Sequence, residues 1–378
     1  MAGDDKPLGE RIEVPSIPKD AQRQIELLER EFVRAELDQL RKSIPSMRPL
    51  YQKRNALISS KEVQDTDFWP RVFSHAPAEI DEYILPSDSG ILGECLRNLT
   101  VERFEVDDQG NGEPRSLRFI FEFATGDENP YFENAKIVKD FYYRYQVTKT
   151  AKGKRRTWEG LVSEPVRINW KEGMDPTKGL LDAACDLFEA EKKNKGVDRT
   201  KLPEYEALVK KLEEVEAENV TNDEDEEADD DDHPEAGQSP VGLSFFAWFG
   251  YRGRDVTAEQ SEAARKEDEE RYQKLLKGEA VDDGAENDDD DEDEDDEEDS
   301  LEAAEIFADG EELATSLAED LWPSALKYYV ESFETMIDLD DLDDEDMEDV
   351  GEDDDEEEEA KGKKKEDSNE RPRKKART

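Results

Sequence analysis

Several features on which enzymes and secreted proteins depend are scarce or missing in this sequence. Its 378 residues include two histidines and two cysteines, Cys95 and Cys185, which lie far apart. Neither a disulfide framework nor a histidine-rich metal site is therefore expected. No apolar run approaches the roughly 20 residues that a membrane span needs, and Met1–Glu10 has no hydrophobic signal core. These absences predict a soluble protein of a reducing intracellular compartment.

Basic residues are also scarce relative to acidic ones. Lys and Arg number 52 against 105 Asp and Glu, which gives a net charge of −53, and charged residues (42%) outnumber hydrophobic ones (34%). Three tracts, residues 223–235, 282–299 and 338–359, hold 42 of the acids and no lysine or arginine. The rest of the chain then carries −11, which suits a folded acidic domain, whereas the tracts are predicted to be disordered.

A long amphipathic helix is predicted near the N-terminus. Residues 19–60 contain no glycine, Asp20 can serve as the N-cap, and Pro45 and Pro49 should bend or interrupt the helix locally. About 40 residues would span roughly 60 Å, which favours pairing with a second copy over packing on its own domain. The residues expected at the dimer interface are Ile25, Leu28, Phe32, Val33, Leu37, Leu40, Ile44, Met47 and Tyr51.

Alternating apolar and polar residues further along predict an antiparallel sheet of about four strands. Residues 99–106 and 116–123 flank a turn sequence at 107–112, which indicates a hairpin. Two further strands are expected at 139–147 and 158–168. With the helices, they predict an α+β domain. The strand aromatics could form a base-stacking platform for nucleic acid, but core packing suits an acidic protein better.

Six short strings occur in an order that resembles the nucleosome assembly protein family, in particular its SET or template-activating factor subgroup, with a fungal member indicated. They are PLYQKRNALI (49–58), FW (68–69), DENPYFEN (127–134), INWKEG (168–173), FFAWF (245–249) and DLWPSALKYY (320–329). The resemblance implies a homodimer joined through the long helix. Each subunit would carry an "earmuff" domain, a four-stranded sheet with covering helices, whose acidic underside receives core histones.

Resemblance and composition together predict how the chain is divided. The expected segments are a disordered N-terminus (1–18), the dimerisation helix (19–60), the first part of the earmuff domain (61–176), an insert with an acidic tract (177–242), an aromatic segment (243–251), a second acidic insert (252–310), C-terminal helices (311–335), an acidic tail (336–360) and a basic tail (361–378).

Three of these segments have alternative interpretations. The inserts, the first with a helix candidate at 203–215, depart from the subgroup pattern and are either acidic loops beside the histone face or solvated spacers. The aromatic run Phe245–Phe249 is either an exposed partner patch or, by the resemblance, part of the core. The basic tail is expected to be a nuclear localisation signal, with a DNA-touching arm or a counterion for the acidic tail as the alternatives.

Clustered carboxylates can compete with DNA phosphates for basic histones, because non-specific histone–DNA affinity comes largely from Lys and Arg. The tract residues expected to contact histones are Asp288, Asp289, Asp290, Asp291, Glu292, Asp353, Asp354, Asp355 and Glu356. Those expected to engage a nuclear import receptor are Lys363, Lys364, Lys365, Arg371, Arg373, Lys374, Lys375 and Arg377. None of the tracts has the spacing of an EF-hand loop.

The sequence thus predicts a nuclear histone chaperone, with possible shuttling to the cytoplasm, that acts in nucleosome assembly, disassembly and chromatin remodelling. No phosphate-binding loop, dinucleotide motif or catalytic triad can be placed, so we expect neither an enzyme nor a cofactor, a metal, a membrane or a specific nucleic acid. By resemblance, the alternative is an acidic nuclear regulator that inhibits a serine/threonine phosphatase or assists a histone acetyltransferase.

Overall fold

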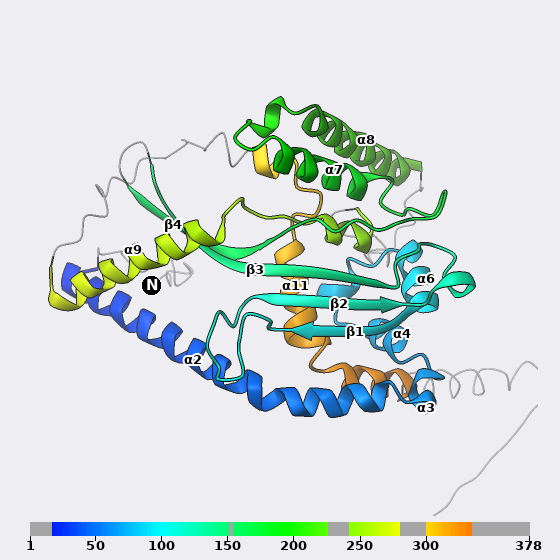
Figure 1. Cartoon of the computed structure of the whole chain (residues 1–378), viewed down its shortest axis with the longest axis horizontal. Helices are drawn as coiled ribbons and strands as arrows, with labels where there is room; N and C mark the ends of the chain where they lie inside the picture. The colour runs from blue at the N-terminus through cyan, green and yellow to red at the C-terminus, as the bar shows by residue number, and fades with distance from the viewer. Residues whose placement is uncertain (1–16, 151–153, 226–241, 280–299, 335–378) are drawn as a thin grey trace, which may run out of the picture. The chain divides into compact units, whose positions relative to one another are not determined.

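The computed structural model describes residues 17–150, 154–225, 242–279 and 300–334 (Figure 1). The chain divides into two compact units, Met1–Phe333 and Glu334–Thr378. Apart from residue 334, the second unit lies outside the described residues. Most of the three acidic tracts also lies outside them.

The first unit has the α+β fold that the sequence predicts. Its four strands are β1 (Leu96–Glu102), β2 (Leu117–Phe123), β3 (Lys136–Lys149) and β4 (Arg155–Ser163). They form one antiparallel sheet in the order β1-β2-β3-β4. The expected bounds of two strands were wrong: β1 ends before Val106, and β4 ends at Ser163, since Pro165 has no N–H for the ladder.

The turn between β1 and β2 forms where the sequence predicts it. The Asp107 carboxylate accepts the backbone N–H groups of Gln109 (2.9 Å) and Asn111 (2.8 Å). Gly112 has φ +119°, and a Cβ there would lie 1.8 Å from the carbonyl oxygen of Glu105. Only glycine fits this position.

The long N-terminal helix is α2, Lys19–Ile58. Asp20 is not its N-cap: the N-cap is Pro18, two residues earlier, and Asp20 lies in the first turn, where its charge favours the helix dipole. The helix continues through Pro45 and Pro49 without interruption. Its ribbon bends along its length in Figure 1, as prolines inside a helix lead one to expect.

Shorter elements complete the unit. Four helices lie between α2 and the sheet in the sequence, and the others follow β4. They are α3 (Lys61–Gln64), α4 (Phe68–Phe73), α5 (Ala78–Asp81), α6 (Pro86–Cys95), α7 (Leu180–Lys193), α8 (Pro203–Asp225), α9 (Ala258–Lys277) and α11 (Gly310–Ser316), with short turns η1 (Gly126–Glu128), η2 (Arg199–Lys201), η3 (Phe245–Gly250) and η4 (Leu317–Leu321). A final helical stretch covers residues 325–334.

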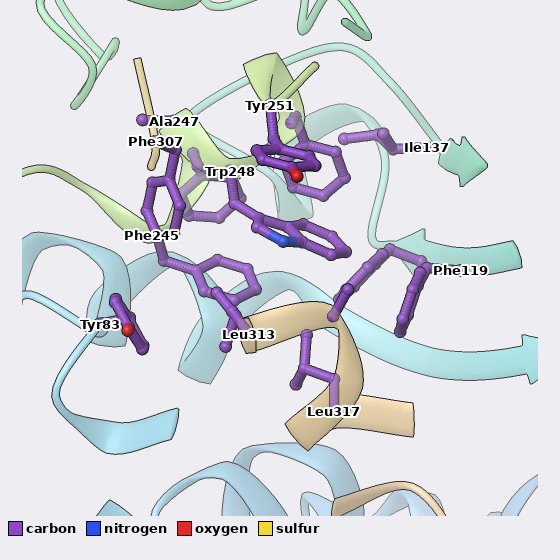
Figure 2. Close-up of a cluster of buried hydrophobic side chains, with 14 of the residues drawn as sticks. Tyr83, Phe119, Ile137, Phe245, Ala247, Trp248, Tyr251, Phe307, Leu313 and Leu317 are labelled. Carbon is purple, nitrogen blue, oxygen red and sulfur yellow. The ribbon is translucent and has the colours of Figure 1, made fainter. Parts of the chain in front are cut away.

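The core is centred on the aromatic run, which forms η3 against the sheet (Figure 2). Trp248 is fully buried, with its ring 5.1 Å from those of Phe119 and Phe141, and its indole N–H donates to the carbonyl of Gly310 (2.9 Å). Core packing is therefore confirmed for η3 and for the strand phenylalanines Phe119, Phe121, Phe123 and Phe141, whereas Tyr143 and Tyr145 are half-buried. The alternatives, a partner patch and a base-stacking platform, are wrong.

A lysine lies inside this core. Lys139 on β3 has no exposed surface, and its ammonium group donates to the carbonyls of Glu164 (2.8 Å), Phe249 (3.0 Å) and Tyr251 (2.7 Å). Burial lowers the pKa of Lys139 from 10.5 to about 7. The side chain thereby ties the C-terminal end of η3 and the residue that follows β4 to the strand beneath them.

The first insert is packed, at least where the structure describes it. Helices α7 and α8 lie side by side above the sheet (Figure 1), and α7 also contacts η3. Leu208, Leu212 and Val215 of α8 are buried. The sequence predicted part of α8 but missed α7, whose buried residues are Leu180, Leu181, Ala184, Cys185, Leu187 and Ala190. The described part of this insert is therefore not a solvated spacer.

Candidate functional site

The predicted dimerisation residues of α2 fall into two groups. Ile25, Leu28, Phe32, Val33 and Met47 are exposed, whereas the other four are half-buried. Two leucines that the sequence analysis left out, Leu50 and Leu57, are each 54% exposed. An α-helix turns by about 100° per residue, and five exposed apolar side chains of α2 point within roughly 60° of one another around its axis. They are Ile25, Leu28, Phe32, Leu50 and Leu57, called here the α2 apolar face.

Several of the remaining dimerisation candidates face the chain's own domain. A groove of about 710 Å³ lies between α2 and the sheet, and Leu40, Ile44, Met47 and Tyr51 line its α2 side. Trp322 lines the opposite side, with its ring centroid 4.2 Å from that of Tyr51. The predicted stripe thus divides into two parts: its N-terminal part is exposed, whereas its C-terminal part faces the sheet and Trp322.

A buried arginine joins α2 to the domain at this point. Arg54 is 7% exposed and lies over the rings of Tyr51 (4.8 Å) and Trp322 (4.2 Å), and it donates to the Trp322 carbonyl. Burial lowers the pKa of Arg54 to about 10. The contact fixes the C-terminal part of α2 to the end of the folded unit.

Acidic side chains gather where α5, α11 and the last helix meet. Helices α5 and α11 are in contact, and two buried tyrosines, Tyr83 and Tyr328, lie next to them. Burial, followed by hydrogen bonding to Asp320 and the charges of nearby carboxylates, raises the pKa of Tyr328 to about 12. Burial and neighbouring carboxylates likewise raise the pKa of Tyr83. The carboxylates around the two rings are Glu79, Glu82, Asp309, Glu312, Asp320 and Glu331, called here the acidic face.

The acidic face can attract a cationic partner. Glu79, Glu82 and Glu312 are exposed, and the other three carboxylates are partly exposed. One cation lies close: the Lys327 ammonium is 3.9 Å from the Glu331 carboxylate and 5.0 Å from the Tyr328 ring centroid. A basic ligand could pair with several of these carboxylates at once.

The acidic face leaves no signal in the sequence, because its members come from positions 79–82 and 309–331 and form no local run. The predicted histone-contacting residues, Asp288–Glu292 and Asp353–Glu356, lie outside the described residues. So do all the basic residues of the predicted localisation signal, 363–377. Their roles remain predictions.

Metal-binding, membrane-spanning and nucleophilic features are absent or weak within the described ranges. No group of three or more His, Cys, Asp or Glu side chains there could hold a metal ion. No helix in these ranges is long and apolar enough to cross a membrane. Both cysteines are buried, and burial raises the pKa of each thiol to about 11, which makes them weak nucleophiles at neutral pH.

Comparison with known proteins identifies the family. The profile of the nucleosome assembly protein (NAP) family matches residues 61–332, so the chain belongs to this family. A Schizosaccharomyces pombe protein named as a nucleosome assembly protein is 33% identical over 148 residues, which cover 39% of this chain and 55% of that protein. The Drosophila melanogaster protein SET is 32% identical over 141 residues, which cover 35% of this chain and 42% of SET.

The chain thus spans about half the length of each of these two relatives. Among solved structures, a crystal structure of a Ccp1 mutant is 23% identical, with a TM-score of 0.44, and covers 84% of this chain and 98% of that one. A second structure, of Ccp1, gives a TM-score of 0.43 at the same identity and covers 83% and 96%.

Proposed function

We propose that this protein is a histone chaperone that binds core histones and acts in nucleosome assembly and disassembly, without catalysing a reaction. The observation that carries the proposal is membership of the nucleosome assembly protein family over residues 61–332. The acidic face supplies a second, independent support, because a basic histone needs a surface rich in carboxylates.

The proposed mechanism divides the work between the folded unit and the tracts. The acidic face has fixed geometry, so it can select a histone surface by shape and charge spacing. The tracts, with 10, 15 and 17 acids, supply charge density that raises the local concentration of a polycation. At physiological salt the Debye length is about 8 Å, so only clustered acids attract at a distance. Histones would be shielded from DNA and released by exchange.

The α2 apolar face supports a homodimer. Ile25 and Leu57 lie at equal distances from residue 41 along the helix, and so do Phe32 and Leu50. A two-fold axis at residue 41 would place Phe32 of one copy opposite Leu50 of the other, with the helices antiparallel. Glu36, Gln39, Ser43 and Ser46 lie between these pairs on the same side of the helix. The apolar pattern therefore complements itself in this register.

Nuclear import through the basic tail, residues 361–378, is part of the proposal. It rests on the two basic clusters in that tail and on the nuclear site of nucleosome assembly.

Neutralising the acidic face tests histone binding. Replacing Glu79, Glu82, Glu312 and Glu331 by glutamine keeps side-chain size and spares Asp309 and Asp320, which hydrogen-bond the tyrosines. We expect affinity for a core histone pair to fall about 10-fold to 100-fold, because several charge contacts are lost together. Binding is measured by fluorescence titration at 300 mM salt, where screening weakens the long-range attraction of the acidic tracts.

The control removes the same charge elsewhere. Glu133, Glu172, Glu206 and Glu213 are exposed and lie outside the acidic face. Their replacement by glutamine should change affinity less than two-fold. Equal losses in the two variants would show that net charge alone decides binding, and an unchanged affinity in both would remove the acidic face from the mechanism.

A further inference from the structure

Helix α9, from the second predicted insert, lies between the N-terminal half of α2 and the β3–β4 hairpin (Figure 1). Thr257 and Gln260 form a capping box at its start, and Gly278 ends it in the left-handed conformation. These caps define the helix ends independently of its partners. The described part of this insert is therefore an ordered element that bridges two others.

The contact between α9 and α2 consists of charged side chains around one ring. Three ion pairs join the helices: Glu26 with Arg271, Arg30 with Asp268, and Arg34 with Glu269. Tyr272 of α9 is 4% exposed, and the guanidinium groups of Arg30 and Arg34 lie 5.1 Å and 4.0 Å from its centroid. Ionic and cation–π attraction therefore dominates this contact.

The other side of α9 is fixed to the sheet. Asp268 also pairs with Arg155 at the start of β4 (2.8 Å), and the Ser261 hydroxyl accepts the backbone N–H of Tyr145 on β3 (2.9 Å). Arg265 pairs at 2.6 Å with Glu113 in the β1–β2 connection. A helix held in this way can transmit the orientation of the sheet to α2.

We propose that α9 is an ionic latch that sets the angle between α2 and the sheet. The three latched residues of α2 are 26, 30 and 34, and the next side chain of α2 that bonds to the sheet region is Arg41, through the Gly112 carbonyl. Residues 26, 30 and 34 lie on roughly the opposite side of the helix from the α2 apolar face. The latch therefore orients α2 and leaves the α2 apolar face open. This role does not depend on histone binding.

Charge swaps on the full chain test the latch. The variant Glu26→Arg with Arg34→Glu reverses two ion pairs, and adding Arg271→Glu and Glu269→Arg restores opposite charges. Spin labels on Gln22→Cys and Thr157→Cys report the distance between α2 and β4; both positions are exposed, whereas Cys95 and Cys185 are buried. Excess unlabelled protein restricts the measurement to distances within one chain.

Opening the latch should lengthen the distance. Residue 22 lies about 35 Å along α2 from Pro45, so a tilt of about 15° there moves it by about 9 Å. We expect a narrow distance distribution in the parent protein and a broader one, longer by about 9 Å, in the two-residue reversal. The four-residue swap should recover at least half of the shift, since the Arg34–Tyr272 contact stays lost. An unchanged distance in the reversal, or no recovery in the swap, would overturn the proposal.

Discussion

Replacing Phe32 by glutamate is expected to convert a dimer into a monomer at micromolar concentration. Phe32 is 61% exposed in the single chain, so the substitution should leave the fold intact. In a symmetric dimer each substitution occurs twice and places a charge against the partner's apolar face. The dissociation constant should rise about 100-fold or more. Sedimentation velocity over a concentration series measures this change.

Val197→Glu is the matched control, because Val197 is also exposed (49%) but lies in the connection between α7 and α8. The orientation is tested by cross-linking. A Phe32→Cys, Leu50→Cys variant should form an intersubunit disulfide, whereas Phe32→Cys alone should not, because antiparallel helices keep the two copies of residue 32 far apart. Cross-linking of the single variant would instead indicate parallel helices, and a Phe32→Glu dimer of unchanged affinity would exclude the α2 apolar face.

Periodicity predicted the long helix and the four strands because both features depend on local residue order. The same method could not divide the apolar residues of α2 between the chain's own domain and a partner, since it followed spacings of three and four without knowing which side the domain covers. Leu40 and Ile44 line the groove in the chain's own unit, and Leu50, which faces away from it, was overlooked. Whether an apolar residue on a helix faces its own core or a partner depends on tertiary packing.

The acidic face and the α9 latch could not be predicted in this way. Tyr328 and Glu79 are about 250 positions apart in the sequence, and only the fold brings them together. The dense tracts attracted attention because their charge is local, whereas scattered carboxylates on folded elements leave no pattern in the sequence. Similarly, α9 has mixed charges typical of a solvated helix, and nothing in its sequence identifies Arg30 or Arg155 as partners of Asp268.

Lys139→Met should destabilise the folded unit and remove part of its pH dependence. The substitution leaves the carbonyls of Glu164, Phe249 and Tyr251 without their shared donor. The loss is about 2 kcal/mol at pH 9, where the neutral amine has two N–H groups for the three carbonyls. The folded pKa of Lys139 is about 7, against 10.5 for an ordinary lysine. Between these values unfolding takes up a proton, so the lysine makes the free energy of unfolding rise with pH, by at most about 1.4 kcal/mol per unit.

Urea unfolding of the parent protein and of Lys139→Met at pH 7, 8 and 9 isolates this effect, because all other titrations cancel in the difference. The parent's advantage should grow with pH across this window. Burial and nearby carboxylates raise the pKa of Tyr83 and Tyr328, whose contributions fall only at higher pH. Lys136→Met is the control, because it removes an exposed lysine from the start of the same strand. A constant difference at Lys139 would mean that this lysine keeps its proton when folded, so that the three carbonyls compensate fully for its burial.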